Sequence, residues 1–361
     1  MVAEWSFWVH DMATGNPIER LSVTADAPFS ASLSGDGESS LTVVLSEQTW
    51  GTGNIRWLFN PNARMLVRWW GENGGAHAGD VVMCAHKIDS FDYDRDKGAV
   101  TVAAVDVFDF ADWRLIDGVG ADKYSKLSIT NKSASGAVRA AVARMMQWNA
   151  QWQLPIDLPA DGGGGFSGEW VFWKGTLIGD VLKEIRDRTG CEIYFAPYPT
   201  ESGGVRFRTL VGAPIDAGRT HFHLEAEQSP LAGIRYRVDG ANQVTGVEGI
   251  GAGTGEDQHR ASAGGTVGIP IRDTRKSFPD LIGNELQQAT DTYYAANVGA
   301  VIQWDIGSYT AGDGWGPELV TPGRTLEIEV YGDPVIPDGE HHVRVVKVSG
   351  DSGRVIQPEV Q

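Results

Sequence analysis

Two histidines and a glutamate alternate along a short segment in the second half of the chain. His221, His223 and Glu225 occupy every second position, and alternate residues of a β-strand point to the same face. Two imidazoles and a carboxylate are a ligand set that zinc uses. The same alternation is typical of the solvent-facing side of an antiparallel sheet. Because no further ligand cluster is evident, we favour the solvent-facing interpretation, expect no metal or cofactor, and keep these three residues as the candidate ligands.

Three aspartates at alternate positions are similar to the start of a calcium-binding loop. Asp92, Asp94 and Asp96 precede Gly98, but in such a loop the glycine comes one position earlier and residue twelve is a glutamate. The twelfth position here is Ala103. The segment is therefore predicted to be a solvated hairpin turn.

Signatures of catalysis are missing from the sequence. The segment 165–168, Gly-Phe-Ser-Gly, lacks the spacing of a nucleophile elbow. Neither a phosphate-binding glycine loop with lysine nor a dinucleotide fingerprint occurs. Carboxylates are abundant, so a glycosidase pair stays open, but no pair stands out. We predict that the chain is not an enzyme.

The charge balance restricts the classes of partner. The 361 residues include 47 acidic and 30 basic ones, a net charge of −17. Stable nucleic-acid binding needs clustered lysine and arginine, whereas an acidic channel wall lets DNA pass without holding it. The two cysteines, Cys84 and Cys191, exclude a disulfide framework and indicate synthesis in a reducing cytoplasm. We expect no signal peptide and no membrane anchor.

Tryptophan is abundant, with 13 residues, several of them in close groups. Such residues are usually core or subunit anchors, and the alternative is a platform on which sugars stack. We favour anchoring. The candidate interface anchors are Trp69, Trp70, Trp148, Trp152, Trp170 and Trp173.

The order of patterns along the chain predicts three domains. Residues 1–112 contain six or more short strand-like segments separated by turns, which predicts a β-sandwich or barrel. Residues 113–212 add helical periodicities near 133–148 and 176–190, which predicts a smaller α/β domain. Residues 213–361 form a second β domain with one helix near 279–297 and a flexible Gly-, Ala- and Ser-rich loop at 251–268. The predicted fold class is mainly β with an α/β insertion.

Several segments resemble the tail-hub, or minor tail, proteins of siphoviruses that infect actinobacteria. The resemblance extends over nearly the whole chain and rests on patterns, not on a catalytic signature. The segments that carry it are 28–37 with 41–45, 182–190 followed by 191–195 and 211–212, and 322–324 with 337–339 and 343–345.

This resemblance implies a structural virion protein, a baseplate-type hub at the phage tail tip. It implies a homotrimer in which two tube-forming β domains per chain, here 1–112 and 213–361, form a ring around the DNA exit channel. The ring adapts a sixfold tail tube to a threefold tip, and 113–212 is peripheral. The implied neighbours are the distal tail protein ring, the C-terminus of the tape-measure protein, and a tail fibre or tip cap protein. DNA passes through the lumen without stable binding.

A second function of a different class is a carbohydrate-binding virion protein that contacts host cell-wall glycans. The tryptophan content and the β architecture support it. A glycan array separates the two hypotheses: the carbohydrate-binding protein binds to it, and a purely structural hub does not. The hypothesis of a hydrolase is supported only by the abundant carboxylates, and an activity screen on peptidoglycan tests it.

Overall fold

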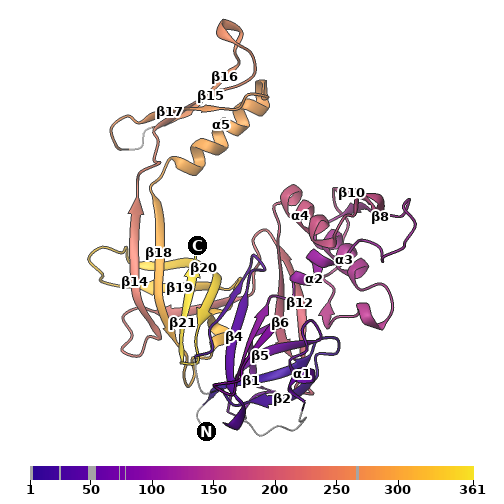
Figure 1. The fold of residues 1–361 in the computed structure, drawn as a ribbon. Coiled ribbons are helices and arrows are strands. Elements are labelled where there is room, and N and C mark those ends of the chain that lie inside the picture. The colour runs from indigo at the N-terminus through magenta and orange to yellow at the C-terminus, as the bar shows by residue number, and fades with distance from the viewer. Residues whose placement is uncertain (1–2, 24–25, 48–53, 73, 78, 266–267) are drawn as a thin grey trace. The chain divides into compact units, whose positions relative to one another are not determined.

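The computed structural model describes residues 3–361 except 24–25, 48–53, 73, 78 and 266–267. The fold is mainly β with few helices (Figure 1), which confirms the predicted fold class. The chain forms two compact units. Unit 1 consists of Met1–Gly233 and Ile306–Gln361, and unit 2 is Ile234–Asp305.

A large sheet contains strands from both ends of the chain. Its N-terminal strands are β1 (Glu4–Asp11), β2 (Pro17–Leu21), β3 (Phe29–Ser32), β4 (Glu38–Val44), β5 (Arg64–Gly71), β6 (Val81–Asp94) and β7 (Ala99–Val105). Its later strands are β13 (Arg219–His223), β14 (Leu231–Asp239), β18 (Val301–Thr310), β19 (Thr325–Val330), β20 (Gly339–Gly350) and β21 (Val355–Val360). The strand order is β14-β18-β21-β20-β3-β4-β7-β6-β5-β1-β2, and β19 with β13 branches from β20.

The N-terminal part of this sheet is buried on both faces at β5. Met65, Val67 and Trp69 belong to one hydrophobic cluster, whereas Leu66 belongs to another on the opposite side. Successive side chains of a strand point to opposite faces. A strand that is covered on both sides therefore needs apolar residues at successive positions. This is why the segment 65–70 is apolar at nearly every position. The short helix α1 (Ile55–Leu58) contributes its last residue to the second cluster.

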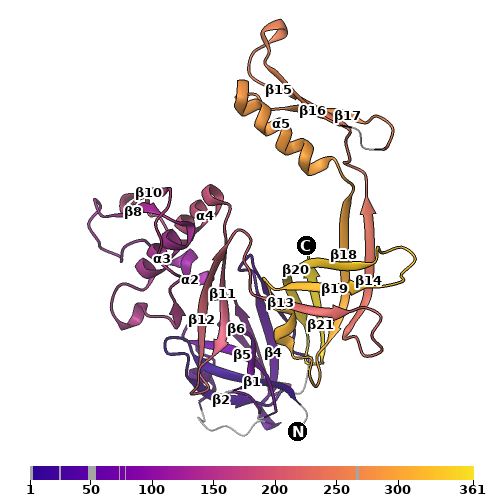
Figure 2. The ribbon, with the colours of Figure 1, turned by 180° about the vertical axis from the view of Figure 1, so that it is seen from behind.

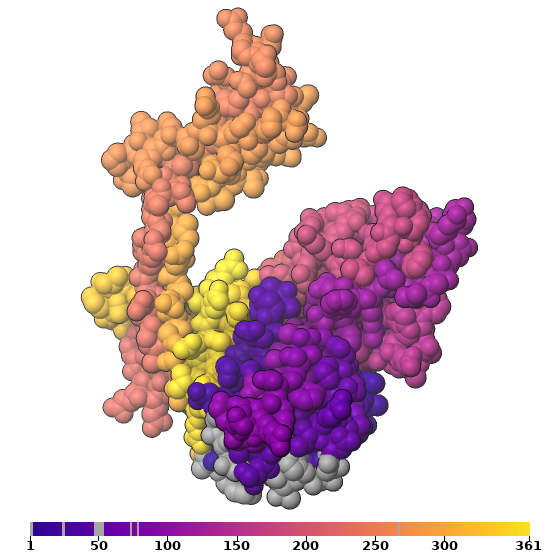
Figure 3. Space-filling model, viewed as in Figure 1, coloured from indigo at the N-terminus to yellow at the C-terminus, as the bar shows by residue number. Residues whose placement is uncertain are grey.

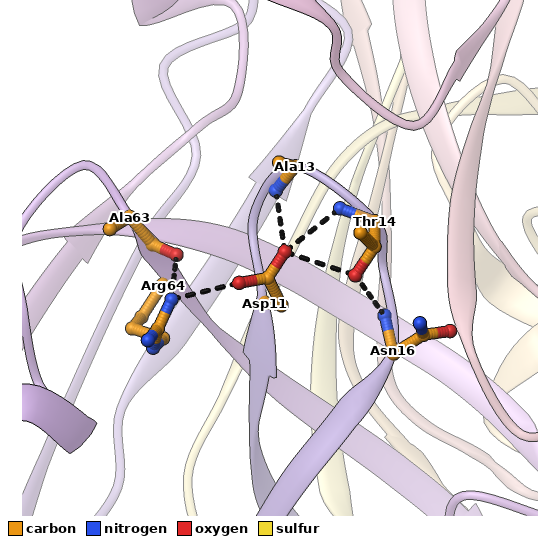
Figure 4. A network of polar contacts seen from close by, with 6 residues as sticks. All are labelled: Asp11, Ala13, Thr14, Asn16, Ala63 and Arg64. Atoms are coloured by element: carbon orange, nitrogen blue, oxygen red, sulfur yellow. Dashed lines mark hydrogen bonds and ion pairs between the residues drawn. The ribbon is translucent and has the colours of Figure 1, made fainter. Parts of the chain in front are cut away.

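Polar contacts hold the turn between β1 and β2 against the start of β5 (Figure 4). One carboxylate oxygen of Asp11 accepts hydrogen bonds from the backbone N–H groups of Ala13 and Thr14, at 3.2 and 3.0 Å. The other oxygen lies 2.8 Å from Nη1 of Arg64. The arginine is nearly buried, so this ion pair fixes where the turn sits on the sheet.

The hairpin predicted at the acidic segment is present as the turn between β6 and β7. Asp94 lies at the end of β6, and its Oδ1 accepts the N–H groups of Asp96 and Lys97 at 3.0 and 3.1 Å. A carboxylate that accepts backbone donors two and three residues ahead stabilises a turn without any ion.

The C-terminal strands join the N-terminal ones through direct pairing of β20 with β3. Lys347 pairs with Ser32 and Gly350 with Phe29 in an antiparallel register. In the space-filling view the yellow C-terminal strands lie directly against the indigo N-terminal strands (Figure 3). Strands from both predicted β regions therefore belong to one sheet.

The α/β segment covers one side of the N-terminal strands. Its elements are α2 (Asp109–Trp113), β8 (Lys126–Lys132), α3 (Ala134–Met145), β9 (Ile156–Asp157), β10 (Phe166–Val171), α4 (Ile178–Thr189), β11 (Glu192–Pro199) and β12 (Val205–Gly212). The apolar side of α4 consists of Ile178, Val181, Leu182 and Ile185, all fully buried in the cluster that also contains Trp69. The helix ends at Gly190, which is left-handed with φ 67°, as expected of a glycine cap.

Unit 2 pairs a helix with a small sheet. The strands β15 (Gly246–Ile250), β16 (Arg260–Gly264) and β17 (Asp273–Ser277) are ordered β16-β15-β17, and α5 (Gly283–Asn297) packs against β15 and β16. A Cβ at Gly249 would lie 2.0 Å from Oγ1 of the buried Thr290. Glycine at this position therefore permits the close approach of the helix. The helix α5 lies within 279–297, the range in which a helix was expected.

Part of the segment 251–268, which was predicted to be a flexible loop, is instead regular structure. It contains a 3-10 turn (Gly255–Asp257) and the strand β16, in which Ala261 pairs with Gly249 of β15. The small residues of 260–264 show no apolar alternation that predicts a strand. The segment is a strand because the edge of β15 supplies its backbone hydrogen-bond partners. Residues 266–267 lie outside the described part. The three-domain division 1–112, 113–212 and 213–361 stays a prediction. None of the helices in the described part combines the length and apolar character needed to cross a bilayer.

Candidate functional site

Histidines and carboxylates gather on one face of the strands β13, β19 and β20, which lie side by side (Figure 2). The parallel register of β13 with β19 places His221 beside Glu327 and His223 beside Glu329. The antiparallel register of β19 with β20 adds His342 beside Glu327. The site is therefore built by strand pairing between segments about a hundred residues apart.

The opposite face of the same strands is core, which holds the site in place. Phe222, Leu326 and Ile328 are at most 1% exposed, and the Phe222 ring lies 5.7 Å from that of Trp315. Because alternate residues face opposite sides, burial of this face fixes the direction in which the histidines and glutamates project.

Glu329 is the centre of the first group. Its Oε2 lies 3.2 Å from Nε2 of His221 and 2.7 Å from Nδ1 of His223. Its Oε1 accepts a hydrogen bond of 2.6 Å from the hydroxyl of Tyr331, and that bond raises the pKa of Tyr331. The two imidazole rings are 4.8 Å apart between centroids. This arrangement can bind a cation or hold a proton between imidazole and carboxylate.

Glu225, the third candidate ligand from the sequence, does not join this group. The strand ends at His223, and the carboxylate of Glu225 accepts the backbone N–H of Tyr331 at 3.0 Å. His221 and His223 share an exposed face, as predicted, whereas the group of close ligand atoms contains Glu329 and not Glu225. Its place is taken by Glu329, which no local spacing in the sequence could indicate.

A second group lies on the same face and differs in its neighbours. Nε2 of His342 is 2.8 Å from Glu340, and its Nδ1 is 4.0 Å from Glu327. The guanidinium of Arg219 lies 3.0 Å from the same Glu327 oxygen. Glu327 is already paired with the positive charge of Arg219. The second group is therefore less suited to bind a cation than the first.

The six tryptophans predicted as interface anchors divide by burial. Trp69, Trp70 and Trp170 are 0, 4 and 7% exposed. They pack inside unit 1, so for these three the interface interpretation is corrected to core packing. Trp148 and Trp173 are 42 and 64% exposed, and Trp152 is half-buried with its ring 6.4 Å from that of Trp148. These three stay candidate anchors. Trp113, which the sequence analysis missed, is 78% exposed.

No protein-family model matches the chain, and no curated protein matches it. Solved structures do. A 43 kDa tail protein of prophage MuSo2 from Shewanella oneidensis has a TM-score of 0.56 and 11% identity over 99% of this chain and 96% of that one.

A tail protein from Neisseria meningitidis MC58 has a TM-score of 0.51 and 10% identity over 99% and 96% of the two chains. This chain has the fold of phage tail proteins. A chain in the Francisella PdpA–VgrG complex has a TM-score of 0.53 and 9% identity, and the match covers 99% of this chain and 57% of that one.

Proposed function

We propose that this chain is a structural protein of a bacteriophage virion, the hub at the tip of a siphovirus tail. The observation that carries the proposal is the fold, which matches a prophage tail protein over 99% of this chain and 96% of the other. In the proposed assembly three copies form a ring that adapts a sixfold tail tube to a threefold tip. The ring lines the channel through which DNA leaves.

The continuous sheet supports a ring-forming role. Pairing of β20 with β3 joins strands of 1–112 to strands of 213–361 in one sheet, and the paired segments all belong to unit 1. The excess of 47 acidic over 30 basic residues supports a channel wall that repels phosphates. The exposed Trp148 and Trp173 are proposed contacts for neighbouring tail proteins: the distal tail ring, the tape-measure C-terminus, or a fibre or cap.

A serine–histidine pair between β4 and β6 is a poor candidate for catalysis. Oγ of Ser39 lies 2.6 Å from Nδ1 of His86, a contact that a nucleophile and its base would make. Burial, helped by the charge of Arg68, lowers the pKa of His86 to about 3. A base with so low a pKa takes up a proton poorly near pH 7, so this contact does not indicate nucleophilic catalysis.

The trimer is tested by the solution mass of the full chain. We expect light scattering to give about 117 kDa, three times the 39.0 kDa of the single chain, and negative-stain images to show threefold rings. The measurement is made over a hundredfold range of protein concentration, because a weak trimer dissociates on dilution. A mass of 39.0 kDa at every concentration, without rings, would contradict the trimeric hub.

A further inference from the structure

We infer that the first histidine–carboxylate group is a binding site for one divalent transition-metal ion, with Zn²⁺ as the representative ion. The proposed ligands are Nε2 of His221, Nδ1 of His223 and Oε2 of Glu329, the atoms that form the two ion pairs. One ligand atom from each of the three residues lies within 4.8 Å of the others. This site is independent of the proposed role in the tail. The proposed ligand set differs from the sequence-based candidates in having Glu329 in place of Glu225.

The spacing of the ligand atoms fits a tetrahedral ion. Zinc–nitrogen and zinc–oxygen bonds of 2.0–2.2 Å place two ligands about 3.3 Å apart. The observed separations from Glu329 are 3.2 Å to His221 and 2.7 Å to His223. The three ligand atoms, now within 4.8 Å of one another, belong to exposed or half-buried side chains that can rotate to bring each separation to about 3.3 Å. The exposure of the two histidines, 41 and 62%, leaves the fourth position open to water.

The surroundings orient the carboxylate ligand. The hydroxyl of Tyr331 donates to Oε1 of Glu329 at 2.6 Å, which leaves Oε2 directed at the two imidazoles. Hydrogen bonds of this kind to a ligating carboxylate set its direction and strengthen metal binding. The ligands also come from two strands in a fixed parallel register, with a buried core beneath them. The site is therefore largely formed before the ion arrives.

The choice of ion follows from the ligands and their charges. Imidazole nitrogen favours zinc, copper and nickel, whereas calcium and magnesium require mostly oxygen ligands. The ion-pair partners of Glu329 among the described residues are the two histidines. Glu327 is instead paired with Arg219 at 3.0 Å. One metal, not two, is therefore expected on this face.

The competing explanation is an ordinary ion pair between histidine and glutamate, which needs no metal. Titration of the full chain, stripped of metal with a chelator, with zinc chloride at pH 7.5 distinguishes the two. We expect one equivalent of zinc to bind, and the midpoint of thermal unfolding to rise with zinc concentration, because the ion binds only the folded chain. Absence of zinc binding would overturn the inference.

Substitutions locate the site. His223→Ala and Glu329→Gln are expected to weaken zinc binding at least tenfold and to abolish the rise in midpoint. Glu225→Gln, His342→Ala and the exposed His259→Gln in unit 2 are matched controls that are expected to bind as the wild type does. Circular dichroism of each variant without zinc checks that the fold is intact. Equal zinc affinity in Glu329→Gln and the wild type, or loss in Glu225→Gln, would refute this ligand set.

Discussion

Replacing Arg68 by methionine is expected to lower the free energy of unfolding by about 3 to 5 kcal/mol. Arg68 is 4% exposed in β5. Its Nη1 donates to the backbone oxygen of Asp351 at 2.7 Å, and its Nη2 donates to that of Ala27. Burial lowers the pKa of Arg68 to about 10, so the guanidinium remains charged at pH 7.

The size of this effect follows from what the substitution leaves behind. Methionine fills much of the volume, but the buried carbonyl oxygen of Ala27 and the half-buried one of Asp351 lose their donor. Loss of the partner of a buried polar group costs about 1 to 3 kcal/mol. The guanidinium also lies 4.2 Å from the ring centre of Phe29 and 4.8 Å from that of Phe7, and these cation–π contacts are lost as well.

Urea unfolding followed by tryptophan fluorescence measures the change. The matched control is Lys97→Met, because the Lys97 side chain is 79% exposed in its pair with Asp94; there we expect a change within about 0.5 kcal/mol. Arg68→Lys keeps the charge, but a single ammonium group cannot donate to both carbonyl oxygens as the guanidinium does. An intermediate loss of the free energy of unfolding is therefore expected. A loss below about 1 kcal/mol for Arg68→Met would contradict the role assigned to this arginine.

Lowering the pH from 7 to 5 is expected to reduce the free energy of unfolding by roughly 3 kcal/mol. Burial lowers the pKa of His86 to about 3 and that of His10 to about 4. Below pH 6.5 these two histidines therefore bind protons in the unfolded chain but stay neutral in the folded chain. The stabilisation from each neutral histidine is complete above pH 6.5 and is lost as the pH falls toward the folded value.

One buried carboxyl acts in the opposite direction. Burial raises the pKa of Asp106 from 3.8 to about 6, so the folded chain binds this proton first and gains stability as the pH falls from 6. A group that is protonated in only one of the two states changes the free energy of unfolding by about 1.36 kcal/mol per pH unit. Between pH 6.5 and 5 each histidine therefore lowers the free energy of unfolding by about 2 kcal/mol, and between pH 6 and 5 Asp106 raises it by about 1.4 kcal/mol. The net result is the loss of roughly 3 kcal/mol.

The variant His86→Gln separates this explanation from a general acid effect. Without a titrating group at that position, the loss between pH 7 and 5 is expected to fall by about 2 kcal/mol. His259→Gln, at an exposed position in unit 2, is expected to keep the wild-type dependence. If His86→Gln showed the same loss as the wild type, proton uptake by the buried imidazole would not be its cause.

Local patterns predicted the elements that local forces determine. The apolar spacing of 178–185 and the glycine at 190 gave the helix α4 and its end, because side-chain periodicity and a left-handed cap act within a few residues. Alternation of His221 with His223 gave one exposed face for the same reason. The apolar run 65–70, interrupted only by Arg68, identified β5 as a strand.

Long-range pairing is what the sequence could not reveal. Glu329 reaches His223 only through the parallel register of β13 with β19, and β20 reaches β3 across most of the chain length. The burial of Trp69 and Trp70 depends likewise on what packs on each face of β5. The strand β16 has little apolar character of its own, and it exists because β15 presents an edge to it.

The most direct test of a tail-tip role is the position of this chain in intact particles. Particles produced from the genome that encodes it would be labelled with a gold-conjugated antibody against the chain and imaged by electron microscopy. We expect gold at the end of the tail away from the head. Gold on the head or along the whole tail, or purified particles that lack the chain, would contradict the proposal.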